Sequence, residues 1–130
     1  MTFAPIAIVG RSTVLPGALS PEALWTLVSE GRDMVQSAPT GRWRTDPRDV
    51  LCSPDGDAAN RAWSDKGGYV TGFEDIWDPQ GFGVNAAELM ELDPLFHWAL
   101  HCARAALVDA GDNRRGAVDR RRVGAVFGNL

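Results

Sequence analysis

The sequence predicts an α/β fold, in which helices pack against a sheet of buried strands. Two short apolar runs, residues 6–9 and 123–127, lack polar alternation and lead directly into a glycine, which is typical of strands buried on both faces. Between them lie a shorter helical pattern that begins at Pro21 and a longer one that begins at Pro94. Strands that alternate with helices in this way favour the α/β class.

The first apolar run ends at Gly10, a form that often introduces a phosphate-binding loop. The next residues are Arg-Ser-Thr-Val-Leu-Pro-Gly, so neither the G-x-G-x-x-G spacing nor the Lys-Ser/Thr ending of a P-loop is present. Backbone N–H groups need those glycines to approach a phosphate closely. We therefore interpret residues 5–10 as a buried strand and not as a nucleotide site.

The composition is that of a globular chain and argues against several classes of protein. The 130 residues are 45% hydrophobic and 23% charged, as expected for one folded domain or a part of one. The net charge of −4 argues against a nucleic-acid partner. We interpret the C-terminal arginines as a solvated connection between a helix and a strand; they are Arg114, Arg115, Arg120, Arg121 and Arg122.

Nothing in the sequence predicts a membrane or secretory segment. No apolar stretch approaches the roughly 20 residues that cross a bilayer, and the N-terminus lacks the basic-then-apolar order of a secretory signal. We therefore expect a cytoplasmic protein with no membrane partner. In that compartment Cys52 and Cys102 are expected to be free thiols.

The first helix is predicted from the residues at its two ends. Ser20 is a suitable N-cap, Pro21 fits the first helical position, and Gly31 suits the left-handed position that ends a helix. The helix between them is about three turns long. Its apolar face consists of Leu24, Leu27 and Val28.

Residues 38–65 are predicted to form a long loop. They carry several prolines and glycines among aspartates and arginines, without a sustained helical or strand period. Loops of this length in compact domains tend to bind ligands or face partners, and we expect Trp43 and Trp63 to anchor this one. After the loop, residues 69–70 indicate a short strand or extended edge.

The C-terminal half predicts two helices joined at a proline. Asn85 is a suitable N-cap for a short helix over residues 86–92. Asp93 then caps a second helix that runs from Pro94 to about residue 110, and Gly111 ends it. Its apolar stripe, whose alanines suggest close packing against a sheet or another helix, consists of Phe96, Ala99, Leu100, Ala103, Ala106, Leu107 and Ala110.

The residues with reactive side chains form no recognisable catalytic or metal-binding motif. His97 and His101 have the spacing that can aim two imidazoles at one metal, but the glutamate of the zinc-protease motif is replaced by Trp98. Neither cysteine has the electropositive, exposed setting of a nucleophile. Glu74 and Asp75, an acidic pair, have no partner that would fix them for acid–base chemistry. We assign no catalytic, cofactor-binding or metal-binding residue.

Several stretches in one order resemble the N-terminal part of a β-ketoacyl synthase of the polyketide or polyunsaturated-fatty-acid synthase type. They are "IAIVGRSTVLPGALSPEALWTLVSEGRDMV", "GRW" at 41–43, "KGGYV" at 66–70, "FGVNAAELMELDP" at 82–94, "ALVDAG" at 106–111 and "RVGAVFGN" at 122–129. The resemblance implies a thiolase-like α/β fold built from two similar halves. Residues 1–130 would form the N-terminal segment of the first half, an incomplete domain that stops before the catalytic cysteine.

The resemblance also implies an activity for the parent protein. Such a synthase is an acyltransferase that joins a cysteine-bound acyl group to a malonyl group on an acyl carrier protein, with loss of carbon dioxide. The implied partners are the remainder of the ketosynthase domain, the acyl carrier protein and, for the intact domain, a second copy. The implied substrates are phosphopantetheine thioesters, and no cofactor is bound directly. The isolated chain is expected to be inactive.

This sequence departs from the family pattern in the long helix. After Asp-Pro the family has Gln-Gln-Arg, and a glutamate follows four residues beyond that arginine. In this chain Leu-Phe-His at residues 95–97 replaces the first three, and His101 replaces the glutamate. Two histidines cannot form the helical Arg–Glu ion pair. The departure favours a divergent lipid-type or polyunsaturated-fatty-acid-type synthase.

Two other functions remain open from the sequence. The chain could be a non-catalytic interaction module that pairs with a synthase subunit, or a small metal-binding helical protein centred on His97 and His101. A sheet of two strands does not close a core around helices of this length. We therefore expect the isolated chain to be marginally stable, or to persist by self-association or by binding the rest of its parent.

Overall fold

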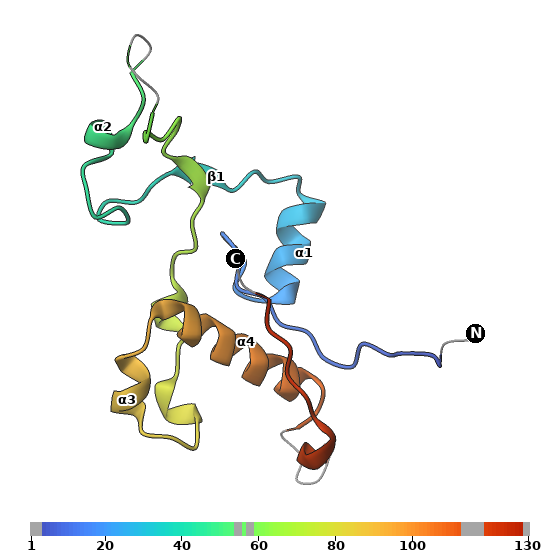
Figure 1. The fold of residues 1–130 in the computed structure, drawn as a ribbon. Helices are drawn as coiled ribbons and strands as arrows, with labels where there is room; N and C mark the ends of the chain where they lie inside the picture. The colour runs from blue at the N-terminus through green and yellow to red at the C-terminus, as the bar shows by residue number, and fades with distance from the viewer. Residues whose placement is uncertain (1–3, 54–55, 57–58, 113–118, 129–130) are drawn as a thin grey trace. The chain divides into compact units, whose positions relative to one another are not determined.

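The computed structural model describes residues 4–53, 56, 59–112 and 119–128. The chain divides into two compact units, which are described separately. The ribbon unit is Thr13–Trp77, and the helical unit combines Met1–Ser12 with Asp78–Leu130. The ribbon unit contains α1 (Pro21–Ser29), β1 (Val35–Ser37), α2 (Pro47–Val50) and β2 (Lys66–Gly68) (Figure 1). The helical unit contains α3 (Ala86–Met90) and α4 (Pro94–Asp109).

Helix α1 has both of the predicted caps. The Ser20 hydroxyl accepts the Ala23 N–H (3.2 Å), and Pro21 occupies the first helical position. At the other end Gly31 has a φ of +63°, and the N–H groups of Gly31 and Arg32 donate to the carbonyls of the last turn. This pair of hydrogen bonds is the Schellman arrangement, which requires a left-handed residue at the Gly31 position.

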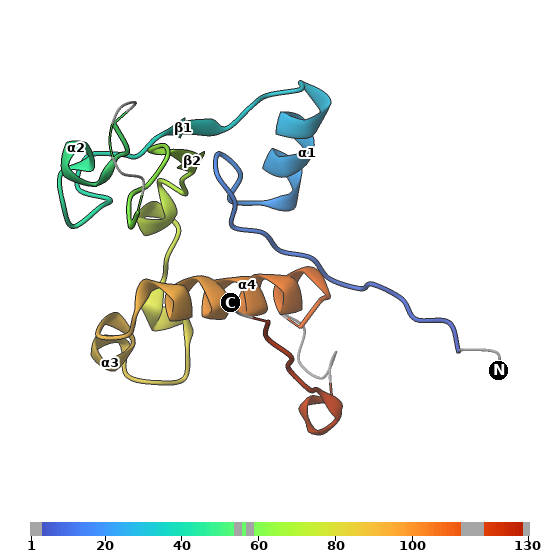
Figure 2. The ribbon, with the colours of Figure 1, turned by 45° about the horizontal axis from the view of Figure 1, so that its top comes forward.

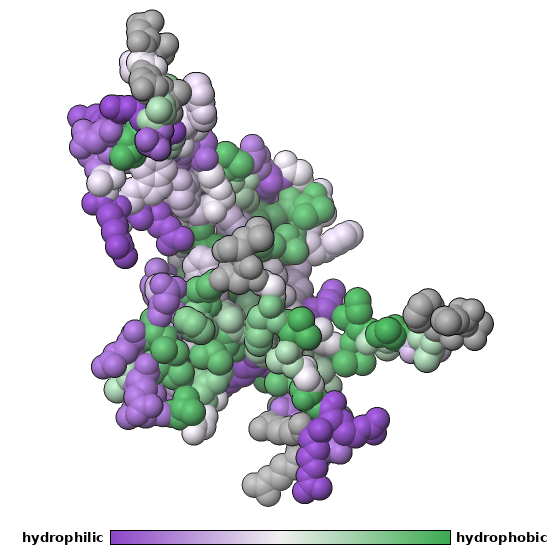
Figure 3. Space-filling view, in the orientation of Figure 1, coloured by the Kyte–Doolittle hydropathy of each residue, from purple (hydrophilic) through white to green (hydrophobic). Residues whose placement is uncertain are grey.

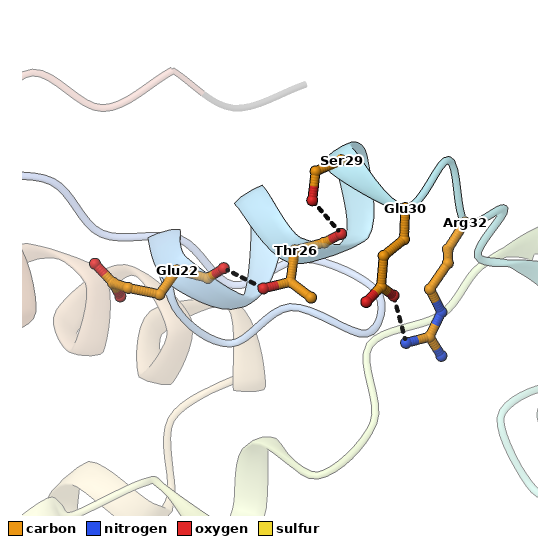
Figure 4. A network of polar contacts seen from close by, with 5 residues as sticks. All are labelled: Glu22, Thr26, Ser29, Glu30 and Arg32. Carbon is orange, nitrogen blue, oxygen red and sulfur yellow. Dashed lines mark hydrogen bonds and ion pairs between the residues drawn. The ribbon is translucent and has the colours of Figure 1, made fainter.

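The exposed side of α1 carries a short run of polar contacts (Figure 4). The Thr26 hydroxyl donates to the Glu22 carbonyl oxygen at 3.1 Å, and the Ser29 hydroxyl donates to the Thr26 carbonyl oxygen at 3.0 Å. Beyond the helix, Arg32 lies 3.6 Å from Glu30. Both of these charged side chains are more than half exposed, so this ion pair contributes little to stability.

The core of the ribbon unit is small. Its buried apolar side chains are Ala18, Leu27 and Phe73, and the Phe73 ring stacks on Trp77 with centroids 5.9 Å apart. Of the predicted apolar face of α1, only Leu27 is buried, whereas Leu24 is half-buried and Val28 is exposed. The prediction for Val28 is therefore wrong for this structure.

A two-stranded ribbon closes the predicted long loop at its base. Strands β1 and β2 pair antiparallel, with Val35 opposite Gly68 and Ser37 opposite Lys66. Within the loop, residues 51 and 62 form a single parallel bridge, so its two halves are held together by hydrogen bonds. The strand expected at residues 69–70 lies earlier, at Lys66–Gly68, and its partner β1 was not predicted because three residues are too few to show a period of two.

The two tryptophans of the loop have different environments. Trp43 is half-buried and lines a hollow of about 410 Å³ together with neighbouring loop residues. Trp63 is among the most exposed apolar side chains of the chain. The expectation that Trp63 anchors the loop is therefore wrong, and hydrogen bonds of the ribbon and of Arg61 to the Asp49 carbonyl oxygen (3.1 Å) hold the loop instead.

The helical unit confirms both predicted helix starts and the predicted end of α4. Asn85 accepts the Ala87 N–H (2.9 Å) to begin α3, and Asp93 accepts the Leu95 N–H (2.9 Å) to begin α4. Helix α3 ends at Met90, two residues before the predicted end. Helix α4 ends as predicted, because Gly111 has a φ of +94° and forms a second Schellman arrangement.

The two predicted buried strands are not strands in this structure. Residues 6–9 and 123–127 run as unpaired segments, and Ile6 and Val126 are 94% and 98% exposed. In Figure 2 both segments are drawn as plain coil. A strand exists only through hydrogen bonds to a neighbouring strand, and within the described ranges no segment pairs with either run. The α/β layering predicted from these runs is therefore not seen, and β1–β2 is the one sheet of the described residues.

The N-cap of α1 can be tested by one substitution. Ser20→Ala removes the acceptor for the Ala23 N–H, which should cost about 1 kcal/mol of local stability. We expect amide hydrogen exchange in α1 to become roughly fivefold faster. Ser29→Ala, on the same helix but away from the cap, serves as the control and should leave exchange near the parent rate. Equal exchange in the two variants would contradict the capping role of Ser20.

Candidate functional site

A concave feature of the helical unit is a groove along α4. We call it the α4 groove; its volume is about 530 Å³ and it lies between α4, the turn at residues 81–83 and the segment that begins at Val123. In Figure 3 apolar side chains gather over α3 and α4. The lining is mainly apolar and consists of Gly81, Phe82, Gly83, Leu100, Ala103, Arg104, Leu107, Val108, Asp112 and Val123.

Arg104 forms one wall of the α4 groove and fastens the neighbouring turn to the helix. Its Nη1 lies 3.2 Å from Asp78 Oδ2, and its guanidinium carbon lies 5.4 Å from the centre of the Phe82 ring. The side chains of Arg104 and Asp78 are 43% and 55% exposed, so the ion pair itself is worth about 1 kcal/mol or less. A Cβ at Gly81 would overlap the guanidinium, so the lack of a side chain there lets Arg104 cross the turn.

The sequence did not predict a role for Arg104, because the prediction for this helix rested on its apolar stripe alone. The one available signal was that Arg104 is the only basic residue between Pro94 and Ala110, apart from the histidines. An isolated cation on an otherwise apolar helix indicates a specific partner, but the spacing alone does not identify Asp78 or Phe82.

A second face of α4 is in contact with the N-terminal segment. Gly10 lies so close to Ala106 and Ala110 that a Cβ there would overlap the Ala106 carbonyl oxygen. Next to it, the Arg11 N–H donates to Asp109 Oδ2 at 2.8 Å. Ala106 and Ala110 therefore pack closely, as predicted for the alanines of the stripe, but their neighbour is the extended backbone at Gly10.

His97 has a structural hydrogen bond. Its Nε2 lies 2.7 Å from the Leu89 carbonyl oxygen. Because a carbonyl oxygen only accepts, His97 Nε2 carries a proton and donates it. Leu89 lies in the last turn of α3, where its carbonyl also accepts the Leu92 N–H, so the imidazole adds a second hydrogen bond there and links α3 to α4.

His101 lies one turn further along α4 and is half-buried. Burial, with a smaller contribution from the positive charge of Arg104, lowers the pKa of its imidazole below the ordinary value. Among the residues that the structure describes, no group of three or more His, Cys, Asp or Glu side chains could hold a metal ion. The pair of histidines at helical spacing therefore lacks a third ligand in this part of the chain.

The other residues considered from the sequence are scattered. Cys52 is in the ribbon unit, with its Sγ 3.4 Å from the Ser53 carbonyl oxygen, and Cys102 is on α4 in the helical unit. Both are free and half-buried. The acidic pair, residues 74–75, is exposed in the 3-10 turn Phe73–Asp75. As far as the structure describes it, the lining of the α4 groove contains no cysteine and no histidine, and it offers mainly apolar contact.

The arginine cluster lies partly outside the described residues. Arg114 and Arg115 belong to residues 113–118, which the structure does not describe. Arg121 and Arg122 are exposed in the 3-10 turn Arg120–Arg122, which is the predicted solvated position. None of the described helices is both long and apolar enough to span a bilayer.

The lowered pKa of His101 predicts a pH dependence of α4. As pH falls through the ordinary histidine pKa of about 6.5, the unfolded chain takes up a proton more readily than the folded one, so stability is lost on acidification. We expect amide exchange in α4 to be faster at pH 5.5 than at pH 7.5 after correction for the intrinsic rate, and His101→Gln to reduce this difference. If the exchange rates at the two pH values differ equally in parent and variant, His101 is not the source of the pH dependence.

Comparison with known proteins identifies the family. Residues 4–129 match the model of the β-ketoacyl synthase N-terminal domain. The chain is 37% identical over 114 residues to mycoketide-CoA synthase of Mycobacterium tuberculosis. The aligned region covers 86% of this chain and 3% of that protein. It is 34% identical over 130 residues to the non-reducing polyketide synthase VdtA of Byssochlamys spectabilis, covering 98% of this chain and 6% of that protein.

A further relative supports the same assignment. Non-reducing polyketide synthase 1 of Elsinoe fawcettii is 32% identical over 125 residues, which is 95% of this chain and 6% of that protein. The chain thus spans a few per cent of the length of these relatives. No solved structure shows a significant match. Because the family model covers residues 4–129, the chain belongs to the β-ketoacyl synthase family and corresponds to its N-terminal domain.

Proposed function

We propose that this chain is the opening segment of the first α/β half of a ketosynthase domain in polyketide biosynthesis. The single observation that carries the proposal is the family match over residues 4–129. Family membership implies a thiolase-like fold. The unpaired runs at residues 6–9 and 123–127 are then two strands of a layered core whose remaining strands come from elsewhere in the domain.

The proposed reaction of the intact domain is a decarboxylative condensation. A cysteine thiolate takes the acyl group from its thioester, the malonyl unit on an acyl carrier protein loses carbon dioxide, and the resulting carbanion attacks the enzyme-bound acyl carbonyl to release the cysteine. Two histidines of the family polarise the malonyl thioester carbonyl. In this proposal Cys52, Cys102, His97 and His101 take none of these roles.

The residues of this chain supply scaffold to that domain. The Asp78–Arg104 ion pair and the Gly10 contact fix two neighbouring segments against α4, and His97 fixes α3 to α4. The Gly10 contact holds the end of the run at residues 6–9 against α4. The proposed setting is the cytoplasm, and the proposed partners are the remainder of the ketosynthase domain, an acyl carrier protein with its phosphopantetheine thioesters, and a second copy of the intact domain.

The proposal also accommodates the departure from the family pattern in the long helix. That departure consists of Leu-Phe-His at residues 95–97 and of His101. In the structure His97 bonds to a backbone carbonyl of α3, a contact that does not need the Arg–Glu pair. The named relatives include two non-reducing polyketide synthases, which supports a polyketide product.

A chimera tests the proposed function. Residues 4–129 would replace the matching segment in the ketosynthase of mycoketide-CoA synthase, and condensation would be measured with acyl and malonyl carrier-protein substrates. We expect condensation well above that of the protein with the segment deleted. Cys52→Ser with Cys102→Ser in the chimera should leave the rate unchanged. A folded chimera without condensation, or loss of activity in the double serine variant, would contradict the proposal.

The isolated chain provides a complementary test. Because we assign the nucleophile to another part of the domain, incubation with an acyl-phosphopantetheine thioester should leave the intact mass of the chain unchanged. The whole ketosynthase domain of mycoketide-CoA synthase, treated in parallel, should gain one acyl group. Stoichiometric acylation of Cys52 or Cys102, abolished by its substitution with serine, would overturn the assignment of a purely scaffolding role.

A further inference from the structure

The first part of the long loop carries a concentration of positive charge. Residues 38–48 contain three arginines, Arg42, Arg44 and Arg48, and a single acidic residue, Asp46. The chain as a whole has a net charge of −4, so the sign of this short segment is opposite to that of the chain. All three arginines are exposed, and in Figure 3 hydrophilic side chains gather over α2. The function proposed above gives these residues no role.

Little within the loop neutralises these arginines. Arg48 Nε lies 3.5 Å from Asp46 Oδ1, and the Arg48 side chain is 90% exposed, so this ion pair is weak and readily exchanged. Within the described ranges, no ion pair joins Arg42 or Arg44 to an acidic side chain. Exposed guanidinium groups in this state are available to carboxylates of another molecule, which they bind with charge-assisted hydrogen bonds.

The same segment encloses a hollow, which we call the loop hollow. Its volume is about 410 Å³, and every residue that lines it lies between positions 38 and 48. The half-buried Trp43 lines the loop hollow together with Pro39 and Pro47, and Arg48 belongs to the same lining. An apolar recess and a cation therefore meet at one place. Tryptophan and arginine are the residue types that most often dominate binding energy at protein interfaces.

The walls of the loop hollow are held at both ends of the segment. The Ala38 N–H donates to the Asp65 carbonyl oxygen at 3.0 Å, next to the paired strands β1 and β2. At the other end, Asp46 Oδ1 accepts the Arg48 N–H at 2.9 Å where α2 begins. Between them, a backbone hydrogen bond of 3.0 Å closes the turn at residues 39–42. A segment that is ordered before it binds loses less conformational freedom in the complex.

The distribution of charge along the loop selects the kind of partner. The whole loop, residues 38–65, carries four arginines and five aspartates. A broad anionic surface, such as a membrane or a nucleic acid, would therefore meet both signs of charge and gain little attraction. A narrow partner can contact residues 38–48 without the aspartates further along. An extended acidic peptide meets this condition, because its carboxylates reach guanidinium groups that are spaced along the segment.

We propose that residues 38–48 form a docking site for an acidic peptide segment of a protein partner. In the complex, carboxylates of the peptide pair with Arg42 and Arg44, and Arg48 exchanges Asp46 for a carboxylate of the partner. One apolar side chain of the peptide enters the loop hollow beside Trp43. The inference rests on contacts within the ribbon unit alone and goes beyond the proposed function. It gives a specific role to the loop that the sequence predicts to bind ligands or face partners.

A titration of the full chain with a defined peptide tests the docking site. The probe is acetyl-Glu-Asp-Leu-Glu-Asp-Glu-amide, and its uncharged counterpart is acetyl-Gln-Asn-Leu-Gln-Asn-Gln-amide, which has nearly the same shape. Binding is followed by the NMR signals of the backbone amides and of the tryptophan indoles. We expect the acidic peptide to shift the signals of residues 38–48 and of the Trp43 indole. It should bind about tenfold or more tightly than its counterpart, and more weakly as the salt concentration rises.

Two double variants separate a local site from general attraction. Arg42→Gln with Arg44→Gln should weaken binding of the acidic peptide about fivefold or more. Arg121→Gln with Arg122→Gln is the matched control, because it removes the same charge from exposed positions of the helical unit. Its affinity should stay within about twofold of the parent value.

Equal affinities of the two peptides for the parent chain, absence of binding, or signal shifts confined to residues outside 38–48 would each overturn the docking site. Equal losses of affinity in the two double variants would assign the binding to net charge and would also overturn it. Circular dichroism should show equal helix content in both variants. The signal shifts are measured on the parent chain, so they decide the question even where a variant fails to fold.

Other occupants of the segment give distinct results. Suppose that the chain binds vesicles of anionic phospholipid, that Arg42→Gln with Arg44→Gln abolishes this binding, and that the peptide shifts no signal. The segment would then belong to a membrane surface, and the inference would be overturned. A concentration-dependent dimer that shifts the signals of residues 38–48 without peptide would assign the segment to a second copy, with the same consequence. None of these measurements involves condensation, so an inactive chimera would contradict the proposed function and leave the docking site standing.

Discussion

The hydrogen-bonding requirement of the extended backbone governs this structure. A helix satisfies its own N–H and C=O groups, whereas an apolar strand needs a neighbour for every second group on each side. Residues 6–9 and 123–127 have the composition of buried strands but no such neighbour among the described residues, and they run exposed along their length. Helix α4 lies beside both segments, because Gly10 packs against it and Val123 lines the groove along it.

Helix α4 organises its surroundings through a few specific contacts. Asp93 and Gly111 fix its ends, Arg104 holds the turn at residues 78–82, and His97 holds α3. Each contact is modest by itself, since most of these side chains are partly exposed and their charges are screened by water. Together these contacts hold α3 and the turn at residues 78–82 beside α4.

The sequence predicted what is determined locally and failed where distant partners decide. Ser20, Asn85 and Asp93 were identified as N-caps because the capping hydrogen bond joins residues two or three apart. The pairing of strands could not be predicted in this way. Composition indicates that residues 6–9 suit a buried sheet, but it says nothing about whether a neighbouring strand is present. The ribbon of β1 and β2 was missed because its strands are too short to show a period of two and its pairing joins residues about thirty positions apart. Arg104 was missed because its partner Asp78 is 26 positions away.

Thermal unfolding of the isolated chain, combined with analytical ultracentrifugation, tests the central claim most directly. If residues 6–9, residues 123–127 and the α4 groove need partners from the rest of the domain, the isolated chain should unfold over a broad range of temperature. Alternatively, its transition should sharpen and rise with concentration as copies associate. A sharp, cooperative transition in a dilute and strictly monomeric sample would show that the chain closes its own core, and would contradict this account.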